Sequence, residues 1–302
     1  MAFQTKYKPG NVLGSGAFAT VQLVTNVETG EQYAAKVALD HRDSRKAFKK
    51  EVEIYQILDH GPSVTNMIEC FGKPDCVIIL EFQSGGDLFD EIVKRNHYSE
   101  DDARNACFQL LTAIKFMHDQ GIAHLDLKPE NVLLDAEFNL KVTDFGEAKT
   151  FNVSSPKKDV FKDFAGTPEY MATEMHKHPR KSIKYSEIVD EFAVGVILYI
   201  LLTGYPPYQS QTDRPICKLY WREKDWDDLE PSSKNLVVSL MEKDPSKRLT
   251  AGEAIKHEWF AKIVGETDMP ETRERLTEFK ARQKFKLGLL LISISLEAKK
   301  LF

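Results

Sequence analysis

Cysteine is scarce in this chain of 302 residues, and no two cysteines form a C-x-x-C pair. The cysteines are Cys70, Cys76, Cys107 and Cys217. Nothing at the N-terminus resembles a signal peptide either. Both absences predict a reducing, intracellular setting. We expect the protein in the cytoplasm, with the nucleus left open as a second compartment.

Long apolar runs and an excess of positive charge are also missing. The longest apolar stretches, Ala193–Leu202 and Leu287–Ile292, are shorter than the roughly 20 residues that cross a bilayer, so no transmembrane segment is predicted. The 41 basic and 46 acidic residues give a net charge of -5, which offers no general attraction for nucleic acid or anionic membrane. Any polyanion must therefore be bound by a local cluster of donors, and we expect no nucleic-acid partner.

Composition and patterning indicate a folded protein in which a β-rich part precedes an α-rich part. A 42% hydrophobic and 29% charged chain of this length is typical of one large domain or two lobes. Alternating apolar residues predict strands in the first ~80 residues, with a hairpin turn at Glu28–Glu31. Helical spacing appears at Phe48–Leu58, and the run Cys76–Leu80 indicates a buried strand.

Beyond Asp87 the pattern is mainly helical. The clearest helices are predicted at Asp101–His118 and Ile188–Leu202, and strand-like fragments remain only at Val132–Leu134 and Leu140–Val142. The polar stretch Thr150–Asp163 predicts a long loop. The chain from about Val264 forms a tail that begins polar and ends amphipathic.

A glycine-rich turn lies near the N-terminus. The segment Gly14-Ser15-Gly16-Ala17-Phe18-Ala19 is flanked by strand-like residues, so it joins two strands and can fold over phosphates. A simple hairpin is the alternative. A dinucleotide-binding oxidoreductase would need a helix after the turn, and here a strand follows.

One lysine lies inside an apolar strand. Lys36 ends the run Tyr33-Ala34-Ala35-Lys36, where an unpaired ammonium group would be costly. Glu51, on the inner stripe of the following helix, is the expected partner. Lys36 could alternatively extend to solvent.

The densest chemical signal is His124-Leu125-Asp126-Leu127-Lys128-Pro129-Glu130-Asn131. Asp126 can orient or accept a hydroxyl proton, Lys128 can meet a γ-phosphate, and Asn131 can ligate a metal ion. Thirteen residues later, Asp144-Phe145-Gly146 offers a second metal ligand. Either piece alone is also explained by a polar loop with an N-capping aspartate.

Together these segments resemble the motif set of eukaryotic protein kinases over roughly Tyr7–Phe260. The resemblance implies an α+β, two-lobed kinase fold, with an N-lobe at about 7–81 and a C-lobe at about 82–260. It implies Mg²⁺ on Asn131 and Asp144, and catalysis by Lys36, Asp126, Lys128 and Asn131. ATP is then expected to contact Leu13, Gly14, Ser15, Gly16, Ala17, Phe18, Ala19, Val21, Ala34, Lys36, Glu51, Leu80, Glu81, Gln83, Asp87, Glu130, Asn131, Leu133 and Asp144.

Further family roles follow from the same resemblance. Leu80–Gln83 would be the hinge that meets adenine, and Thr167 would bond Asp126 and Lys128. Asp190 would brace the catalytic loop, and Arg248 would pair with Glu174. The Asp-Leu-Lys-Pro-Glu-Asn string resembles the Ser/Thr form, so we expect phosphorylation of Ser/Thr hydroxyls on protein substrates. The alternative is a pseudokinase scaffold that binds ATP and partners without transfer, but Lys36, Asp126, Asn131 and Asp144 are all present.

The sequence departs from the family pattern at several positions. Ala19 replaces the third glycine of the phosphate loop, which should not abolish ATP binding. Leu125 replaces the arginine that pairs with a phosphorylated activation loop in many kinases, and Asp163 occupies the place of the usual phosphorylated threonine. We therefore expect that activation-loop phosphorylation is not the on-switch. Thr173 and Phe192, which replace Pro and Trp, should affect local packing only.

Within the family, several segments resemble the calcium/calmodulin-dependent group, among them Gly85-Gly86-Asp87-Leu88-Phe89 and Gly195 to Tyr208. The tail, 264–302, resembles the autoinhibitory and calmodulin-binding segment of those kinases. Residues 276–296 would bind calmodulin or a calmodulin-like sensor, with Phe285, Leu289 and Ile294 at 1-5-10 anchor spacing. No EF-hand loop is visible, so calcium would act through a separate protein.

Two alternatives for the tail stay open. It could simply pack on the large lobe, or it could lie on a membrane surface, which the preceding Glu271, Glu274 and Glu278 disfavour. Thr272 aligns with an autophosphorylated threonine of the multifunctional members, although Met269 stands where they have arginine.

Acids at Asp87 and Glu130 match positions that select basic substrate residues. They predict Arg or Lys on the N-terminal side of the acceptor. Solvated surface acids are the competing explanation.

Overall fold

A computed structural model describes residues 3–16, 18–39, 42–95, 97–154, 161–163, 165–176, 184–210, 212–262 and 267–298, with no side-chain description beyond Phe285. Ala17 of the phosphate loop and positions 264–266 and 299–302 of the tail lie outside the described residues, as do the side chains of Leu289 and Ile294. In the part of the chain that the structure describes, no helix has the length and apolarity that a bilayer crossing requires.

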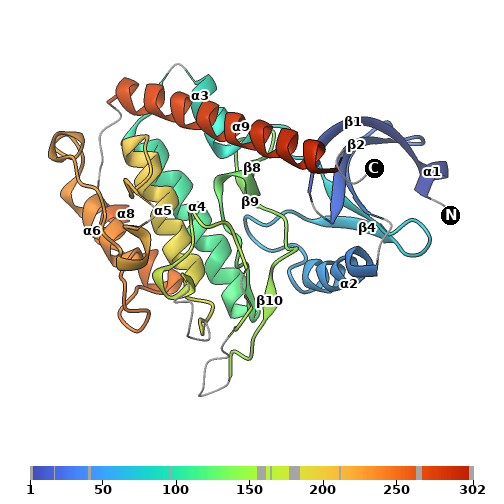
Figure 1. The fold of residues 1–302 in the computed structure, drawn as a ribbon, viewed down its shortest axis with the longest axis horizontal. Coiled ribbons are helices and arrows are strands. Elements are labelled where there is room, and N and C mark those ends of the chain that lie inside the picture. The colour runs from blue at the N-terminus through green and yellow to red at the C-terminus, as the bar shows by residue number, and fades with distance from the viewer. Residues whose placement is uncertain are drawn as a thin grey trace.

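The N-terminal lobe is a five-stranded antiparallel sheet in the order β1-β2-β3-β5-β4, flanked by one long helix (Figure 1). Its elements are α1 (Phe3–Lys6), β1 (Tyr7–Ser15), β2 (Ala19–Asn26), β3 (Gln32–Ala38), α2 (Arg42–Ile57), β4 (Met67–Phe71) and β5 (Val77–Glu81). The predicted turn at Glu28–Glu31 connects β2 and β3. The predicted helix is present but begins earlier, and β4 was not predicted.

The C-terminal lobe is built around α5 (Val189–Thr203), whose residues are all buried. A helix that is apolar on every side belongs in a core, and α4 (Glu100–Asp119) and α6 (Pro231–Leu240) pack against it. The remaining helices are α3 (Leu88–Lys94), α7 (Ala251–Ala254) and α8 (Glu258–Ala261), with short 3-10 turns at Pro129–Asn131, Thr173–Met175, Arg214–Ile216 and Glu223–Asp225.

Small strands position the catalytic loops between the lobes. β8 (Val132–Leu134) and β9 (Leu140–Val142) occupy the predicted positions. The expectation that strand fragments remain only there was wrong, because β6 (Gly86–Asp87) pairs with β8, and β7 (Ile122–Ala123) pairs with β10 (Lys149–Thr150). Two-residue strands have no period that a sequence can display.

The tail forms one long helix, α9 (Pro270–Ala298), which begins before the predicted position 276. In Figure 1 it starts near the end of α5, passes α3 and runs along the C-lobe toward the side that carries the N-lobe sheet. It contacts α3 and α5, so the first part of the tail does pack on the large lobe.

Candidate active site

Strand β3 and helix α2 bring Lys36 to an ion pair with Glu51. The Lys36 Nζ atom lies 2.6 Å from Glu51 Oε1 and 2.7 Å from Asp144 Oδ1. Burial alone would lower the pKa of Lys36, but the two carboxylates outweigh it and hold that pKa above its ordinary value. Lys36 is therefore a fixed cation, and the predicted pairing with Glu51 is present.

The catalytic loop forms a second cluster around Asp126. Lys128 Nζ lies 2.8 Å from Asp126 Oδ2, and the Thr167 hydroxyl donates to Asp126 Oδ1 at 2.7 Å. Lys128 Nζ also donates to Thr167 Oγ1 at 3.2 Å, and Asn131 Nδ2 donates to the Asp126 carbonyl at 2.9 Å. The carboxylate of Asp126 is thus held by a cation and a hydroxyl, in a position where it can orient an acceptor.

Phe145 packs between helix α2 and the catalytic loop. Its ring is fully buried and lies edge-on to Tyr55 of α2, with centroids 4.8 Å apart, and to His124, at 5.6 Å. Asp144, directly before it, has a left-handed backbone (φ 65°), which aims the carboxylate at Lys36. This packing sets α2 and the catalytic loop in one arrangement.

The glycine-rich turn joins β1 to β2, and Val21 of β2 pairs with Lys36 of β3. Gly14 pairs with Val21 and Ser15 with Thr20, and the Gly16 N–H donates to the Ala19 carbonyl at 2.8 Å. Leu13 and Phe18 are exposed.

At the hinge, Leu80 is buried opposite Ala34 of β3. The Glu81 carboxylate accepts the Asn66 N–H at 2.9 Å and pairs with Lys141 at 3.4 Å, which fixes the start of the hinge. Gln83 is buried and Leu133 of β8 partly buried.

The chemistry of the donors fits a magnesium ion. Mg²⁺ prefers oxygen ligands, and proteins commonly bind it through one or two carboxylates together with substrate phosphates. Asn131 uses its amide nitrogen for the Asp126 carbonyl, so its amide oxygen can serve as a ligand. Asp144 uses Oδ1 for Lys36 and retains Oδ2, and its side chain is 47% exposed.

Comparison with known proteins places this arrangement in a family. The model of the protein kinase domain matches residues 7–260. This chain belongs to the protein kinase family. A calcium/calmodulin-dependent protein kinase type II subunit delta from Oryctolagus cuniculus is 35% identical over 309 aligned residues, which cover 95% of this chain and 56% of that protein. The kinase thus spans little more than half the length of this relative, and its resemblance to that group is confirmed.

Beneath the catalytic loop, the kinase has the two structural pairs expected from the resemblance. Asp190 of α5 accepts the backbone N–H groups of His124 and Leu125 at 2.7 and 2.9 Å. Arg248 forms a two-point ion pair with Glu174, at 2.8 and 3.0 Å. Thr173, which replaces proline, donates a hydrogen bond to the Lys243 carbonyl at 3.3 Å.

The part of the activation segment that the structure describes holds Asp163 near Lys149. The Lys149 Nζ atom lies 3.0 Å from Asp163 Oδ2, and the Tyr185 hydroxyl donates to the Asp163 carbonyl at 2.7 Å. The prediction of a loop over Thr150–Asp163 was too simple, because Thr150 belongs to β10 and Phe161 bridges to Tyr185; residues 155–160 lie outside the described residues.

Asp87, expected near a nucleotide ribose or a substrate residue, is bound by the kinase's own tail. The Lys280 Nζ atom of α9 lies 2.8 and 2.6 Å from the two Asp87 carboxylate oxygens and 3.2 Å from Asp90 Oδ1. Desolvation raises the pKa of Glu130, which is exposed, and Lys280 lies close enough for its charge to lower that pKa by a smaller amount. Lys280 lies within the predicted sensor-binding segment 276–296, but nothing in its sequence context indicated this partner.

Proposed function

We propose that this kinase transfers the γ-phosphoryl group of Mg·ATP to Ser/Thr hydroxyls of protein substrates. The observation that carries the proposal is the convergence of one cation–acid pair, Lys36 with Glu51, and one acid–lysine–hydroxyl cluster around Asp126. Phosphoryl transfer depends on positioning and on stabilising charge rather than on covalent chemistry, and such a set of fixed charges supplies both.

Each residue has a role that its contacts support. Lys36 would bind phosphate oxygens, while Asn131 and Asp144 would hold magnesium, which neutralises charge on the transferring group. Asp126 would orient the acceptor hydroxyl, and Lys128, already 2.8 Å from Asp126, would meet the γ-phosphate. Thr167 keeps Asp126 from rotating, because its hydroxyl binds one carboxylate oxygen.

Transfer of radiolabelled phosphate to a generic basic protein tests this proposal. Asp126→Asn should lower kcat by about a thousandfold, equivalent to ~4 kcal/mol of lost barrier lowering. Asp135→Asn is a matched control, since in the described part of the chain the Asp135 carboxylate accepts hydrogen bonds only from its own turn, at Glu137 and Asn139. ATP-dependent thermal stabilisation without transfer in the wild-type chain would instead favour the pseudokinase scaffold.

We also propose that substrates carry a basic residue N-terminal to the acceptor. Asp87 and Asp90 of the C-lobe bind a lysine in this structure, and Glu130 lies close enough to feel its charge. Burial by itself would raise the pKa of Asp90, yet Lys280 holds that pKa below its ordinary value, so the site is anionic. A peptide array that preferred acidic or proline-directed sites would contradict this preference.

The same contact supports an autoinhibitory role for the tail. A substrate lysine or arginine and the tail Lys280 would compete for one pair of carboxylates. Gln283 adds a hydrogen bond to the Tyr170 hydroxyl at 3.2 Å, beside the segment that contains Thr167. Residues 280–284 therefore lie along the surface that a substrate peptide would use.

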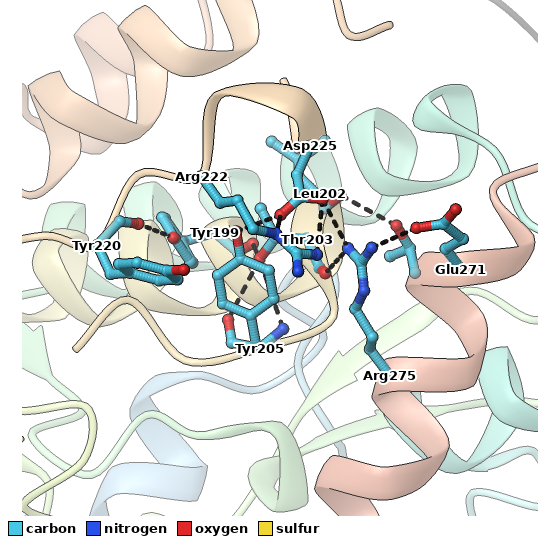
Figure 2. A network of polar contacts seen from close by, with 10 residues as sticks. Tyr199, Leu202, Thr203, Tyr205, Tyr220, Arg222, Asp225, Glu271 and Arg275 are labelled. Carbon is cyan, nitrogen blue, oxygen red and sulfur yellow. Dashed lines mark hydrogen bonds and ion pairs between the residues drawn. The ribbon is translucent and has the colours of Figure 1, made fainter. Parts of the chain in front are cut away.

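The first turns of α9 are anchored in the C-lobe by a polar network (Figure 2). Arg275 donates to the Thr203 carbonyl at 3.1 Å and lies 3.2 Å from Asp225, while Leu276 is fully buried. Gly204 permits this approach: its φ is 78°, and an added Cβ would lie 2.6 Å from the Thr272 carbonyl oxygen.

Thr272 is part of this anchor. It is buried, and its hydroxyl donates to the Leu202 carbonyl at 3.3 Å. The hydroxyl that aligns with an autophosphorylated threonine would therefore need α9 to lift before it could react.

We propose that the sensor which lifts the tail is calmodulin or a similar protein. On the outer side of α9, Phe285 is 68% exposed beside the exposed Arg282 and Lys284, which suits a basic amphipathic helix that enters an apolar groove. Calcium-dependent retention of the full chain on calmodulin resin should be weakened by Phe285→Ala. Phe138→Ala, which removes another exposed phenylalanine, in the turn between β8 and β9, is the control. A mobility on native gels that calcium-loaded calmodulin leaves unchanged would exclude the sensor.

A further inference from the structure

Helix α5 carries two adjacent carboxylates in an otherwise apolar, fully buried helix. Asp190 and Glu191 are each only 1% exposed. Between them lies the imidazole of His118, at the end of α4, with Nε2 3.0 Å from Asp190 Oδ2 and Nδ1 3.3 Å from Glu191 Oε1. Two buried carboxylates thus share one imidazole.

The two acids face different parts of the C-lobe. Asp190 holds the backbone of the catalytic loop at His124 and Leu125, and Leu125 has a left-handed backbone (φ 67°) directly before Asp126. Glu191 accepts the Ala251 N–H at the start of α7 at 2.9 Å. Its other oxygen, Oε2, is buried with no hydrogen-bond partner in the described part of the chain.

We propose that Glu191 is a positioning residue for phosphoryl transfer, acting through His118 and Asp190 on the backbone that places Asp126. The assignment rests on the proposed function. A carboxylate whose second oxygen has no partner in the core lowers stability. A hydrogen bond to Ala251 needs only one acceptor oxygen, so that bond alone does not explain a buried carboxylate here. Its charge instead stabilises an imidazolium that in turn keeps Asp190 ionised.

The charge balance explains why a second acid is needed. With Asp190 alone, His118 and Asp190 would form one buried pair opposed by the desolvation of both ions. With Glu191 as well, the pKa of His118 is raised to about 10 despite burial, and that of Asp190 is lowered. Among the described residues, the charged groups in contact with His118 are these two acids on α5; α7 donates a backbone N–H to Glu191, and the ring of Phe151 lies edge-on to His118 at 6.0 Å.

Glu191→Gln tests the charge while keeping the shape and the bond to Ala251. An opposite charge at this range moves a pKa by about 1–3 units, so the alkaline fall of kcat should move by at least about one pH unit toward neutrality. A three-unit shift of the His118 pKa, from about 10 to about 7, would lower kcat about tenfold at pH 8, and a one-unit shift would lower it about fivefold at pH 10, with KM for ATP unchanged in both cases. Glu100→Gln is the control, because Glu100 is also a buried acid (5% exposed), accepts Trp259 Nε1–H at 2.7 Å and the Glu230 N–H at 3.0 Å, and lies at the opposite end of α4 from His118.

A double-mutant cycle separates positioning from stability. His118→Asn leaves two buried acids without a cation, so adding Glu191→Gln to it should raise kcat, whereas the same change in the wild-type chain lowers it. Equal losses in both backgrounds, or a pH profile that Glu191→Gln and Glu100→Gln shift alike, would overturn the assignment.

Nuclear magnetic resonance of the His118 ring covers the case in which a variant fails to fold. The wild-type imidazole should remain protonated at pH 8, and titration below pH 7 would overturn the proposal. A wild-type chain that transfers no phosphate would refute the proposed function, and this assignment with it. A fully active Glu191→Gln variant would refute this assignment only.

Discussion

Replacement of Lys280 by alanine should activate the 302-residue kinase toward basic substrates. The Lys280 side chain is 9% exposed, and its ammonium contacts both oxygens of Asp87, at 2.6 and 2.8 Å, as well as Asp90 at 3.2 Å. Hydrogen bonds to charged groups contribute about 1.5–3 kcal/mol each, and the desolvation of the lysine offsets part of that sum. A net of about 1.5–3 kcal/mol for the whole contact corresponds to roughly a 10–100-fold change in competition.

Steady-state kinetics with two peptides measures this competition. The peptides should differ only in a basic or a neutral residue N-terminal to the acceptor serine. For Lys280→Ala, KM for the basic peptide should fall by at least about tenfold, and the preference over the neutral peptide should persist because the carboxylates are then free to bind substrate.

Arg282→Ala is the matched control. Arg282 lies on the same helix, carries the same charge, is 78% exposed and pairs with Glu278 rather than with the C-lobe. It should leave KM within about twofold, since exposed ion pairs contribute only ~0–1 kcal/mol. Equal activation by both variants would show that total tail charge matters rather than this contact, and unchanged kinetics of Lys280→Ala would refute the competition altogether.

Other predictions follow from contacts described above. Glu51→Gln should lower kcat/KM at least about tenfold because Lys36 loses its closest acid, and Glu53→Gln on the same helix should not; similar losses in both would refute the pairing. Arg275→Ala should cost about 1–3 kcal/mol in chemical denaturation, and a cost below that of Arg282→Ala would contradict the anchor. Protein made in bacteria and treated with phosphatase should phosphorylate substrate, and complete inactivity would show that activation-loop phosphorylation is required. His118 binds its proton more tightly in the folded chain, so the stability that this proton contributes is fully present below pH 6.5 and is lost as pH rises to about 10. Between these pH values the free energy of unfolding, relative to that of His118→Asn, should fall by at most about 1.4 kcal/mol per pH unit. Parallel pH curves for the two proteins would refute this.

Much of the site was predictable because its residues are close together in the sequence. Asp126, Lys128 and Asn131 lie in one short turn, so their chemistry could be inferred without knowing the fold. Lys36 and Glu51 were predicted as partners because a buried ammonium group needs an acid and the next helix offered one on its inner face.

The remaining contacts could not be inferred in this way. Lys280 and Asp87 are 193 positions apart in the chain, and neither periodicity nor composition predicts a contact over such a separation. The adjacent acids Asp190 and Glu191, at the start of an apolar helix, are a sequence signal of a buried charge that requires a partner, but we predicted a role for Asp190 alone. The sequence offered several histidines, and only packing selects His118.

Strand β4 was not predicted from the sequence, for a different reason. Burial alternates along β4, but its exposed positions carry the apolar Ile68 and Cys70 while its inner side carries Glu69, so the sequence does not show the alternation of a strand.

The way Arg275 enters the C-lobe also determines where this domain can be cut. A fragment that stopped at the family boundary, residue 260, would uncover Gly204, Asp225 and the surface that Leu276 now seals. Such a fragment would expose a surface with apolar and charged residues that α9 now covers, and it would be prone to self-association. Recombinant versions trimmed for crystallisation or fusion should therefore extend past residue 276. Those that end before Lys280 would keep this surface covered and leave the Asp87 carboxylate accessible to substrate.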